Sequence, residues 1–301
     1  MGIAFPLPDE AILARREAII EGLAALVPPA SLIISEDERR AFETDALTAY
    51  RKMPLAVVLP TTTEEVAAVM RYCHQNGVKI VPRGAGTSLA GGAIPQEDAI
   101  IIGVGKMAKI LDVSFSDRTM RVQAGLTNLG ISNAVAHEGF FYAPDPSSQL
   151  ACTIAGNIGM NSGGAHCLKY GVTRHYVLGL EVALANGTLV RLGGRTHKNK
   201  TGFDLHRVFV GSEGLLGVVT EATLKLLPLP PYRALLGVGF DTARDAARSL
   251  TAIFKAGFLP CALEIADEFT LAAACKRTGS KQLAGCRAML FVELDGQERS
   301  V

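Results

Sequence analysis

The sequence predicts an α+β protein made of two successive folded regions, and three observations support this. First, a strand–helix–strand pattern at 55–82 is followed by further strands and a capped helix. Second, a proline-rich break at 228–231 precedes a separate set of strands and helices. Third, a chain of 301 residues, of which 49% are hydrophobic, is long enough for two domains with substantial cores.

Apolar periodicity and capping residues predict the elements of the first region. Threonine before Glu64 and Glu65 gives a helix cap with an acidic first turn, and Gly77 ends that helix. The expected elements are, in order, a helix at 9–27, a strand at 55–60, a helix at 61–77, a strand at 78–82, strands at 99–104, 109–115 and 120–126 (the last two a hairpin), and a helix at 127–139.

Residues 142–172 are rich in Gly, Pro, Ser and Asn and have little regular pattern. They also contain apolar residues such as Leu150 and Ile154, which argues against disorder, so the segment is typical of a functional loop. A hairpin is predicted at 177–192, with Asn186-Gly187 as a type I′ turn. Strand character returns within 208–228.

The second region repeats a strand–helix alternation. The expected elements are a strand at 235–240, a capped helix at 241–257, a strand at 261–267, a helix at 267–276 and a strand at 288–296. The sheet looks incomplete, so an unpaired edge is expected near 288–294. Such an edge predicts aggregation or dependence on a partner.

Composition narrows the function classes. The formal net charge of +1 gives no basic surface for nucleic acid. The N-terminus lacks the apolar core of a signal peptide, and no apolar run is long enough to cross a membrane. The six cysteines form no CxxC pair and the six histidines are dispersed. This pattern predicts a cytoplasmic protein with no disulfide framework, no iron–sulfur cluster of its own and no metal site.

Two familiar phosphate-binding motifs do not fit. The glycine-rich stretch 81–95 is no Walker A motif, because no Gly-Lys-[Ser/Thr] closes it. Residues 103–108 match G-x-G-x-x-A, but an alternating strand pattern follows instead of a long helix, and no acidic residue ends a second strand. A nicotinamide dehydrogenase is therefore the weaker alternative.

Three other clusters suit a ligand that combines a diphosphate with a flat heteroaromatic ring. Glycines in 81–95 allow close backbone approach and positive φ, and successive amides there form a concavity for an anion, with Arg83, Thr87 and Ser88 as further donors. Residues 144–163 offer a proline corner, small donors and small apolar residues. Residues 211–220 form a glycine turn that leads into a strand.

The stretches PRGAGTSLAGGAIP, APDPSSQLACTIAGNIGMNSGG, LKYGVTR and VGSEGLLGVVTEATLKLLP together resemble the FAD-linked oxidase family with a PCMH-type (vanillyl-alcohol-oxidase-like) flavin domain. The nearest branch is that of the glycolate oxidase D-subunit and D-lactate dehydrogenase. The resemblance implies a PCMH-type two-subdomain FAD-binding fold, followed by an incomplete ferredoxin-like α+β substrate domain. It implies an N-terminal helical segment at 1–53, a FAD-binding domain at 54–231 and a substrate domain that starts at 232–301.

The same resemblance implies which residues contact FAD. The first loop would surround the diphosphate, the second cluster would line the isoalloxazine and ribityl region, and the third would hold the adenine side. No histidine occurs at 83–88, where relatives with covalent flavin often have one, so FAD is expected to be non-covalent. The implied cofactor-binding residues are Pro82, Arg83, Gly84, Ala85, Gly86, Thr87, Ser88, Gly91, Gly92, Pro144, Asp145, Ser147, Ser148, Cys152, Thr153, Gly156, Asn157, Gly163, Glu213, Gly214, Gly217, Val218 and Val219.

The function implied is oxidation of a small 2-hydroxy acid, with hydride transfer from C2 to flavin N5. The alternative is a FAD-binding fragment or subunit without turnover of its own, because the late histidine-rich segment of the family is missing. Catalytic residues are left unassigned. The resemblance also implies other glycolate oxidase subunits, including an iron–sulfur protein, and a cytoplasmic location that becomes peripheral to the inner membrane through a partner. The candidates nearest to catalytic chemistry are His137, His166, His175, His206, Arg174, Lys169 and Tyr170.

Overall fold

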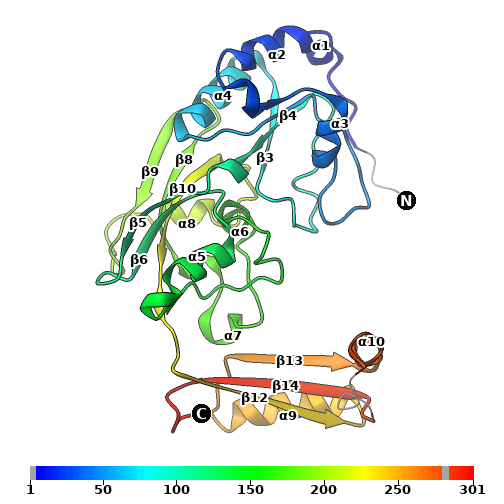
Figure 1. Cartoon of the computed structure of the whole chain (residues 1–301), viewed down its shortest axis with the longest axis vertical. Coiled ribbons are helices and arrows are strands. Elements are labelled where there is room, and N and C mark those ends of the chain that lie inside the picture. The colour runs from blue at the N-terminus through cyan, green and yellow to red at the C-terminus, as the bar shows by residue number, and fades with distance from the viewer. Residues whose placement is uncertain (1–4, 280–284) are drawn as a thin grey trace. The chain divides into compact units, whose positions relative to one another are not determined.

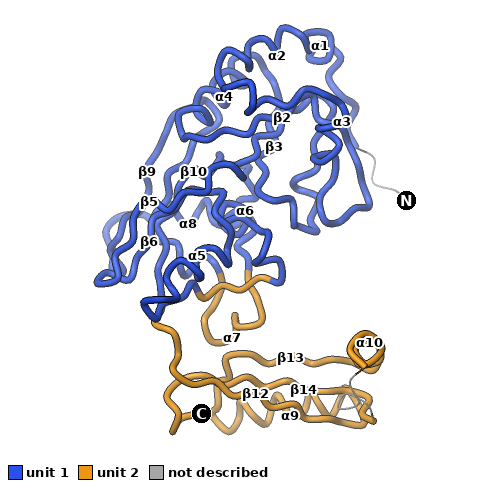
Figure 2. Tube along the Cα trace, in the orientation of Figure 1, with its two compact units in different colours: residues 1–142, 147–162, 173–227 blue, residues 143–146, 163–172, 228–301 orange. Residues whose placement is uncertain are grey.

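The computed structural model describes residues 5–279 and 285–301. The chain divides into two compact units, shown in Figure 2. Unit 1 comprises residues 1–142, 147–162 and 173–227, and unit 2 comprises residues 143–146, 163–172 and 228–301. Because unit 2 takes two short stretches from the middle of the chain, the units are not two consecutive halves.

Unit 1 contains a four-stranded sheet in the order β1-β2-β4-β3. Figure 1 labels β3 and β4 of this sheet. Strands β2, β4 and β3 run parallel, and β1 is antiparallel to β2. The three isoleucines at 100–102 are fully buried, as expected for a central strand covered on both faces. The strands are β1 (Leu32–Ile33), β2 (Ala56–Val58), β3 (Lys79–Arg83) and β4 (Ala99–Gly103).

The crossover between β2 and β3 is helix α4 (Thr63–Asn76). Its Thr62 cap accepts a hydrogen bond from the amide of Glu65 at 3.1 Å, and Gly77 ends the helix with φ +68°. Both end signals were predicted from the sequence, and both are confirmed. They fix where β3 begins, and therefore where the glycine-rich loop leaves the sheet.

The predicted helix at 9–27 is divided in two, α1 (Glu10–Leu13) and α2 (Arg16–Ala24). Arg15 leaves helical geometry, with φ −100° and ψ 14°, and its guanidinium donates to the carbonyl of Asn76 at 2.9 Å. Ile12 and Ile19 are buried on either side of the break. The apolar periodicity therefore survives, although the helix is not continuous. The short helix α3 (Glu36–Arg39) follows.

The second sheet of unit 1 is antiparallel, with five strands in the order β5-β6-β10-β8-β9. The predicted type I′ turn between β8 and β9 is wrong in detail. Only Gly187 has positive φ, and its amide donates to the carbonyl of Leu184, so Ala185 and Asn186 occupy an ordinary turn before a left-handed glycine. The strands are β5 (Ile110–Ser114), β6 (Thr119–Gln123), β8 (Val177–Ala183), β9 (Leu189–Gly193) and β10 (Val218–Lys225).

Short helices lie between these strands. The irregular segment 142–172 contains two of them, which the sequence pattern did not reveal because each is brief and rich in small residues. A two-stranded ladder also joins β7 (Phe140–Phe141) and β11 (Leu227–Pro228). The helices are α5 (Asn128–Val135), α6 (Ile154–Met160), α7 (Cys167–Tyr170) and α8 (His206–Phe209).

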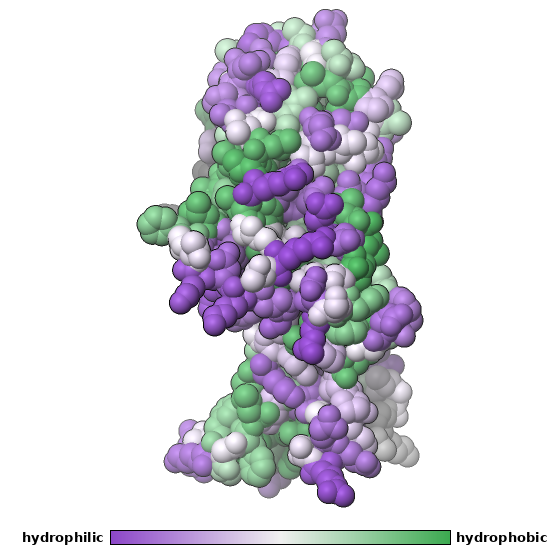
Figure 3. All heavy atoms as spheres, turned by 90° about the vertical axis from the view of Figure 1, so that its left-hand side faces the viewer, coloured by the Kyte–Doolittle hydropathy of each residue, from purple (hydrophilic) through white to green (hydrophobic). Residues whose placement is uncertain are grey.

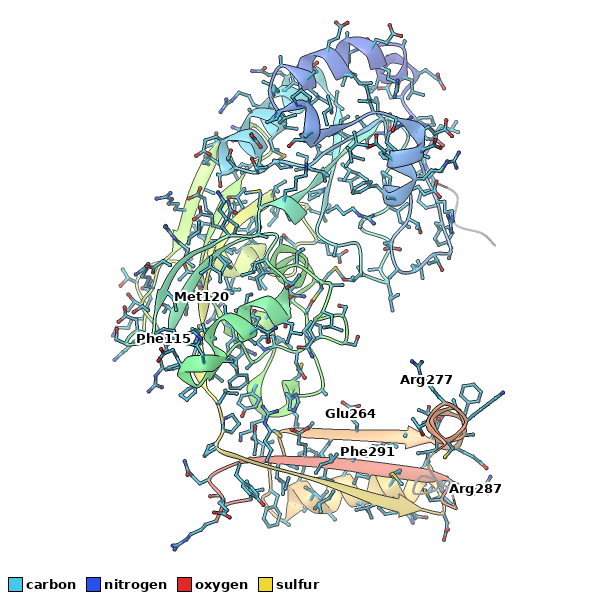
Figure 4. The ribbon with its side chains drawn as sticks, viewed as in Figure 1. Phe115, Met120, Glu264, Arg277, Arg287 and Phe291 are labelled. Carbon is cyan, nitrogen blue, oxygen red and sulfur yellow. The ribbon has the colours of Figure 1, made fainter. Side chains whose placement is uncertain are left out.

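Unit 2 contains a three-stranded antiparallel sheet in the order β12-β14-β13. The predicted unpaired edge near 288–294 is wrong, because β14 is the central strand and pairs along its length with both neighbours. In Figure 4, Glu264 and Phe291 mark one register pair of the β13–β14 ladder. The elements are β12 (Tyr232–Phe240), α9 (Ala243–Lys255), β13 (Ala262–Asp267), α10 (Glu268–Thr278) and β14 (Ala288–Gly296).

The free edges of this sheet are therefore β12 and β13, among the residues that the structure describes. Since β12 and β13 are both antiparallel to β14, they run parallel to each other, and α9 connects them as a split β-α-β unit. Leu235, Leu236 and Val238 of β12 are exposed, and Figure 3 shows hydrophobic atoms at the surface of this unit. The mixture of helices and sheets in both units confirms the predicted α+β class.

No described helix has the length and hydrophobicity needed to cross a membrane.

Candidate cofactor site

A cavity of about 330 Å³ lies in unit 1, and three stretches of chain line it: 82–93, 148–162 and 209–219, together with Val104. These stretches coincide with the three clusters singled out in the sequence. The implied cofactor residues that line the cavity are Pro82, Arg83, Gly84, Ala85, Gly86, Thr87, Ser88, Gly92, Ser148, Cys152, Thr153, Gly156, Asn157, Glu213, Gly214, Gly217, Val218 and Val219.

Five implied residues do not line the cavity: Gly91, Pro144, Asp145, Ser147 and Gly163. The Gly91 amide instead donates to the buried Asp45 carboxylate at 2.9 Å. Pro144, Asp145 and Gly163 belong to unit 2, where the Asp145 carboxylate pairs with His166. Contact between these five residues and a cofactor thus stays a prediction without support from the cavity.

The first lining loop presents a run of unused backbone donors. No described residue accepts a hydrogen bond from the amides of Ala85, Gly86, Thr87 or Ser88. Gly86 has φ +71°, so the backbone takes a left-handed conformation within the stretch 85–88. Consecutive amides around such a left-handed residue form a concavity that binds an anion. The loop therefore has the donors that a phosphate group requires.

A buried aspartate and a buried arginine hold this loop in shape. The carboxylate of Asp45 accepts hydrogen bonds from the amides of Gly91 (2.9 Å) and Leu47 (3.0 Å). The Arg83 guanidinium donates from Nη1 to the carbonyls of Thr44 (2.8 Å) and Ala93 (3.1 Å). Burial lowers the pKa of Arg83, an effect that the nearby Asp45 charge opposes. Arg83 thus braces the loop, and a direct contact with phosphate remains a prediction.

Two glycines allow the loops to approach each other closely. A Cβ on Gly84 would lie 2.3 Å from Oγ1 of Thr153, and one on Gly214 would lie 3.0 Å from Cγ of Pro82. Gly214 also has φ +80°, which disfavours any other residue. The first loop therefore packs against both of the other lining stretches, and this packing defines the cavity walls.

The second stretch uses its polar groups mainly to hold helix α6. Thr153 caps the helix, with Oγ1 accepting from the amide of Gly156 at 3.3 Å. Asn157 is buried, and its Nδ2 donates to the Cys152 sulfur (3.2 Å) and to the Ser162 hydroxyl (3.3 Å). These hydrogen bonds make Thr153 and Asn157 supports of the cavity wall, and a contact between either side chain and a cofactor stays a prediction.

The third stretch offers an open backbone edge. Val218 and Val219 pair with β8 on one side, whereas β6 pairs with β10 only from Glu221 onward. One side of these two valines therefore has no strand partner among the described residues, and both valines line the cavity. Beside them Glu213 has φ +54°, a conformation that costs a non-glycine residue about 1–2 kcal/mol.

The residues considered for catalysis lie elsewhere. None of His137, His166, His175, His206, Arg174, Lys169 and Tyr170 is among the described residues that line the cavity. Burial lowers the pKa of His206 and of His175, with like charge from Arg174 adding to the effect at His175. The structure thus assigns no catalytic base within the cavity.

Several residues of the site were not predicted from the sequence. Asp45 and Thr44 are far from the glycine loop in the chain, and no motif marks them. Phe209 was equally unmarked, whereas Met160 lies within the predicted cluster 144–163 without being one of the implied contact residues. The further lining residues are Leu89, Ala93, Val104, Ala155, Gly159, Met160, Ser162, Phe209 and Ser212.

Two family descriptions match the chain. "FAD binding domain" matches residues 54–193, and "FAD linked oxidases, C-terminal domain" matches residues 229–301. The chain is 42% identical over 286 residues to glycolate oxidase subunit GlcD of Escherichia coli K12, covering 95% of this chain and 57% of the relative. It is 32% identical over 277 residues to D-lactate dehydrogenase of Anaerostipes hadrus, covering 90% of this chain and 58% of the relative. The chain thus spans somewhat more than half the length of these relatives.

Solved structures share the fold. Alkyldihydroxyacetonephosphate synthase matches with a TM-score of 0.79 at 22% identity, over 99% of this chain and 58% of that protein. Substrate-bound p-cresol methylhydroxylase matches with a TM-score of 0.80 at 20% identity, over 98% of this chain and 63% of that protein. The fold is therefore of the PCMH type, as the sequence resemblance implied.

The cavity residues fit FAD. Four unused amides with a left-handed glycine suit a diphosphate. An open strand edge at Val218 and Val219 suits the polar rim of one ring, the adenine, and the small residues Ala155 and Gly156 suit the face of the other, the isoalloxazine. Each part of a dinucleotide thus has a complementary group in the cavity lining.

Proposed function

The chain belongs to the FAD-linked oxidase family, and from this premise we propose that it is a FAD-dependent oxidoreductase acting on the CH–OH group of a small 2-hydroxy acid of the glycolate or D-lactate class. The run of unused amides from Ala85 to Ser88 in the cavity lining is the observation that carries the cofactor part of this proposal. The substrate class rests on the relatives, whose names specify glycolate oxidase and D-lactate dehydrogenase.

The chain's own residues hold and orient the cofactor. The 85–88 amides bind the diphosphate, while Asp45 and Arg83 keep that loop in place from behind. The Val218–Val219 edge holds the adenine side through backbone groups. When bound, FAD supplies N5 as the acceptor for the hydride that leaves C2 of the substrate.

We propose that the FAD is bound non-covalently. No histidine is found among the described lining residues, and the 83–88 stretch carries Thr87 where covalent relatives often carry a histidine. Acid denaturation followed by centrifugation should therefore leave all the flavin in the supernatant. Flavin that stays in the pellet would contradict this.

A second candidate is a FAD-binding subunit without turnover of its own. It is favoured by the lining itself, in which Arg83 and Glu213 are the charged side chains among the described residues and Arg83 is occupied by backbone carbonyls. We also propose cytoplasmic partner subunits, including an iron–sulfur protein that places the assembly at the membrane. The name of the E. coli relative, a glycolate oxidase subunit, supports the existence of partners.

A visible spectrum of the purified chain, after addition of FAD and removal of the excess, tests the cofactor. We expect a bound flavin spectrum that bleaches when glycolate or D-lactate is added without oxygen. A spectrum that persists with every hydroxy acid supports the second candidate instead. No bound flavin would refute both.

A pair of glycine variants separates a specific effect on the FAD-binding loop from the general cost of a side chain at positive φ. Gly86→Ala and Gly139→Ala both place a side chain at positive φ, +71° and +73°, and thus have similar backbone costs. Only at Gly86 would the new Cβ collide, 2.2 Å from Nη2 of Arg83. We expect Gly86→Ala to weaken FAD binding at least tenfold and Gly139→Ala to leave it unchanged.

A further inference from the structure

A cluster of three different donor side chains lies in unit 2 and takes no part in the cavity described above. One ligand atom each from His166, Cys261 and Glu293 lies within 4.8 Å of the other two. His166 precedes α7, Cys261 precedes β13, and Glu293 lies in β14. The cluster thus joins the stretch 163–172 to the sheet of the same unit.

The imidazole of His166 is oriented from behind by a carboxylate. Its Nδ1 lies 2.5 Å from Oδ2 of Asp145, whose Oδ1 accepts from the His166 backbone amide at 3.3 Å. This contact leaves Nε2 as the atom that faces Cys261 and Glu293. A carboxylate that holds the far nitrogen of a histidine is the usual outer-shell partner of a metal-ligating histidine.

The His166 nitrogen on the side of Glu293 lacks a good hydrogen-bond partner among the described residues. Nε2 of His166 is a buried atom and makes no well-directed hydrogen bond within the described chain, although Oε2 of Glu293 lies 3.2 Å away. The thiol of Cys261 is almost fully buried, and its sulfur donates to the backbone carbonyl of Glu293 at 3.2 Å. Burial, followed by the nearby negative charges of Asp295 and Glu293, raises the pKa of this thiol to about 11.

The donor types select a class of ion. An imidazole nitrogen, a thiol sulfur and a carboxylate oxygen suit a borderline divalent ion such as Zn²⁺ or Co²⁺, whereas Mg²⁺ and Ca²⁺ prefer oxygen alone. Bond lengths of about 2.0–2.3 Å to such an ion place tetrahedral ligand atoms about 3.3–3.8 Å apart. The ligand atoms lie within 4.8 Å of one another, so the widest pair needs a contraction of at most about 1.0–1.5 Å to reach that geometry.

The local charges also balance a divalent ion. Asp145, Glu293 and a Cys261 thiolate would carry three negative charges, and Nη1 of Arg233 lies 3.8 Å from Oε1 of Glu293. The ion and Arg233 together neutralise these three charges. His166 and Glu293 keep about a fifth of their side chains exposed, at 20% and 23%, which leaves a route for an ion to enter.

We propose that His166, Cys261 and Glu293 bind a divalent zinc-type metal ion, with Asp145 as the outer partner of His166. Binding replaces the thiol proton, which passes to solvent, with a metal–sulfur bond and involves no oxidation. The ion would tie the 163–172 stretch to β13 and β14. The sequence does not predict this metal site, because His166, Cys261 and Glu293 are far apart in the chain and do not have the spacing of known zinc ligands.

The alternative is an ion triad in which a protonated His166 lies between Asp145 and Glu293. Those two carboxylates raise the pKa of His166, although burial lowers it. The triad explains the imidazole and the carboxylates, and it leaves the Cys261 thiol protonated and donating to the Glu293 carbonyl. Cobalt substitution therefore distinguishes the two, because only the metal site forms a bond to sulfur.

The test is a titration of the full chain with Co²⁺ under reducing, chelator-free conditions, followed as a difference spectrum. We expect one Co²⁺ per chain, with a near-ultraviolet thiolate-to-cobalt charge-transfer band that Zn²⁺ abolishes by displacement. Cys261→Ser should remove the band, whereas Cys275→Ser, a matched thiol variant on α10, should keep it. Asp145→Asn should weaken Co²⁺ affinity about 10–100-fold while keeping the band.

A wild-type chain that gives no such band overturns the proposal, and this result does not depend on any variant folding. A band that persists in Cys261→Ser overturns it as well. Flavin content, measured by fluorescence after acid release from the same samples, reports on FAD binding separately. Loss of flavin without loss of the cobalt band would therefore refute the proposed function and leave the metal site standing.

Discussion

The close approach of Gly84 to Thr153 predicts a measurable coupling between the first two lining stretches. Gly84 has no positive φ, so an alanine there meets no backbone strain, only the Thr153 hydroxyl at 2.3 Å. The next nearest atom, the amide nitrogen of Gly156, is at an ordinary 3.4 Å. Gly84→Ala therefore forces the Thr153 side chain to move and lose its cap on α6.

The magnitudes follow from these contacts. Thr153→Ala alone removes the cap and should cost about 1 kcal/mol of unfolding free energy. Gly84→Ala alone should cost about 1–3 kcal/mol, through overpacking and the lost cap together. In the double variant the colliding atom is gone, so Gly84→Ala should then cost close to nothing. The expected coupling energy is about 1–3 kcal/mol, in the sense that the double variant is more stable than additivity requires.

The assay is urea unfolding of wild type, both single variants and the double variant, each with and without FAD. The matched control is Gly105→Ala in the same cycle, because a Cβ there meets nothing within 4 Å and should combine additively with Thr153→Ala. If the Gly84 and Thr153 variants are additive within about 0.5 kcal/mol, the two stretches do not meet as described, and the reasoning about the cavity wall fails.

Three further predictions concern residues around the cavity and the first sheet. Asp45→Ala removes the acceptor of the Gly91 and Leu47 amides and should lower the free energy of urea unfolding by about 2–4 kcal/mol. Asp45→Asn keeps one acceptor and should cost less. Equal losses in the two variants would contradict a hydrogen-bonding role for Asp45. Glu213 already carries the strain of φ +54°, so Glu213→Gly should be neutral to about 1 kcal/mol stabilising, because relief of the strain is partly offset by the entropy of glycine in the unfolded chain. Glu213→Val should destabilise by about 1–2 kcal/mol, because a β-branched residue tolerates this φ still less well. The same melting temperature for both variants would show that the strain is not there. Burial raises the pKa of Asp98, but hydrogen bonds from Lys79 (2.7 Å) and from the Asp9 amide (2.8 Å) outweigh it and leave that pKa below the ordinary value of 3.8. This stabilisation is thus present above the unfolded-state pKa and lost as the pH falls through the folded-state pKa. Wild type should therefore lose stability more steeply than Asp98→Asn as the pH falls from about 5 to about 2, with a slope difference of at most about one proton, and parallel curves would refute this.

Local signals in the sequence located many elements correctly. Thr62 and Gly77 bound helix α4 because capping is decided by neighbouring residues and by glycine's access to positive φ. The three glycine-rich stretches were recognisable for the same reason, since backbone freedom is a property of the residues themselves. Errors arose where a local pattern was compatible with two geometries, as at Asn186-Gly187 and at the break near Arg15.

What the sequence by itself determined is the α+β class, the family, and the stretches whose amides are free to face a ligand. What only the tertiary structure decided is which distant groups meet: Asp45 behind the glycine loop, β14 between its two neighbours, and His166 beside Cys261 and Glu293. The physical reason is that caps and turns depend on nearest neighbours along the chain. Pairings across the fold depend instead on how whole faces pack, and one sequence carries no local record of that.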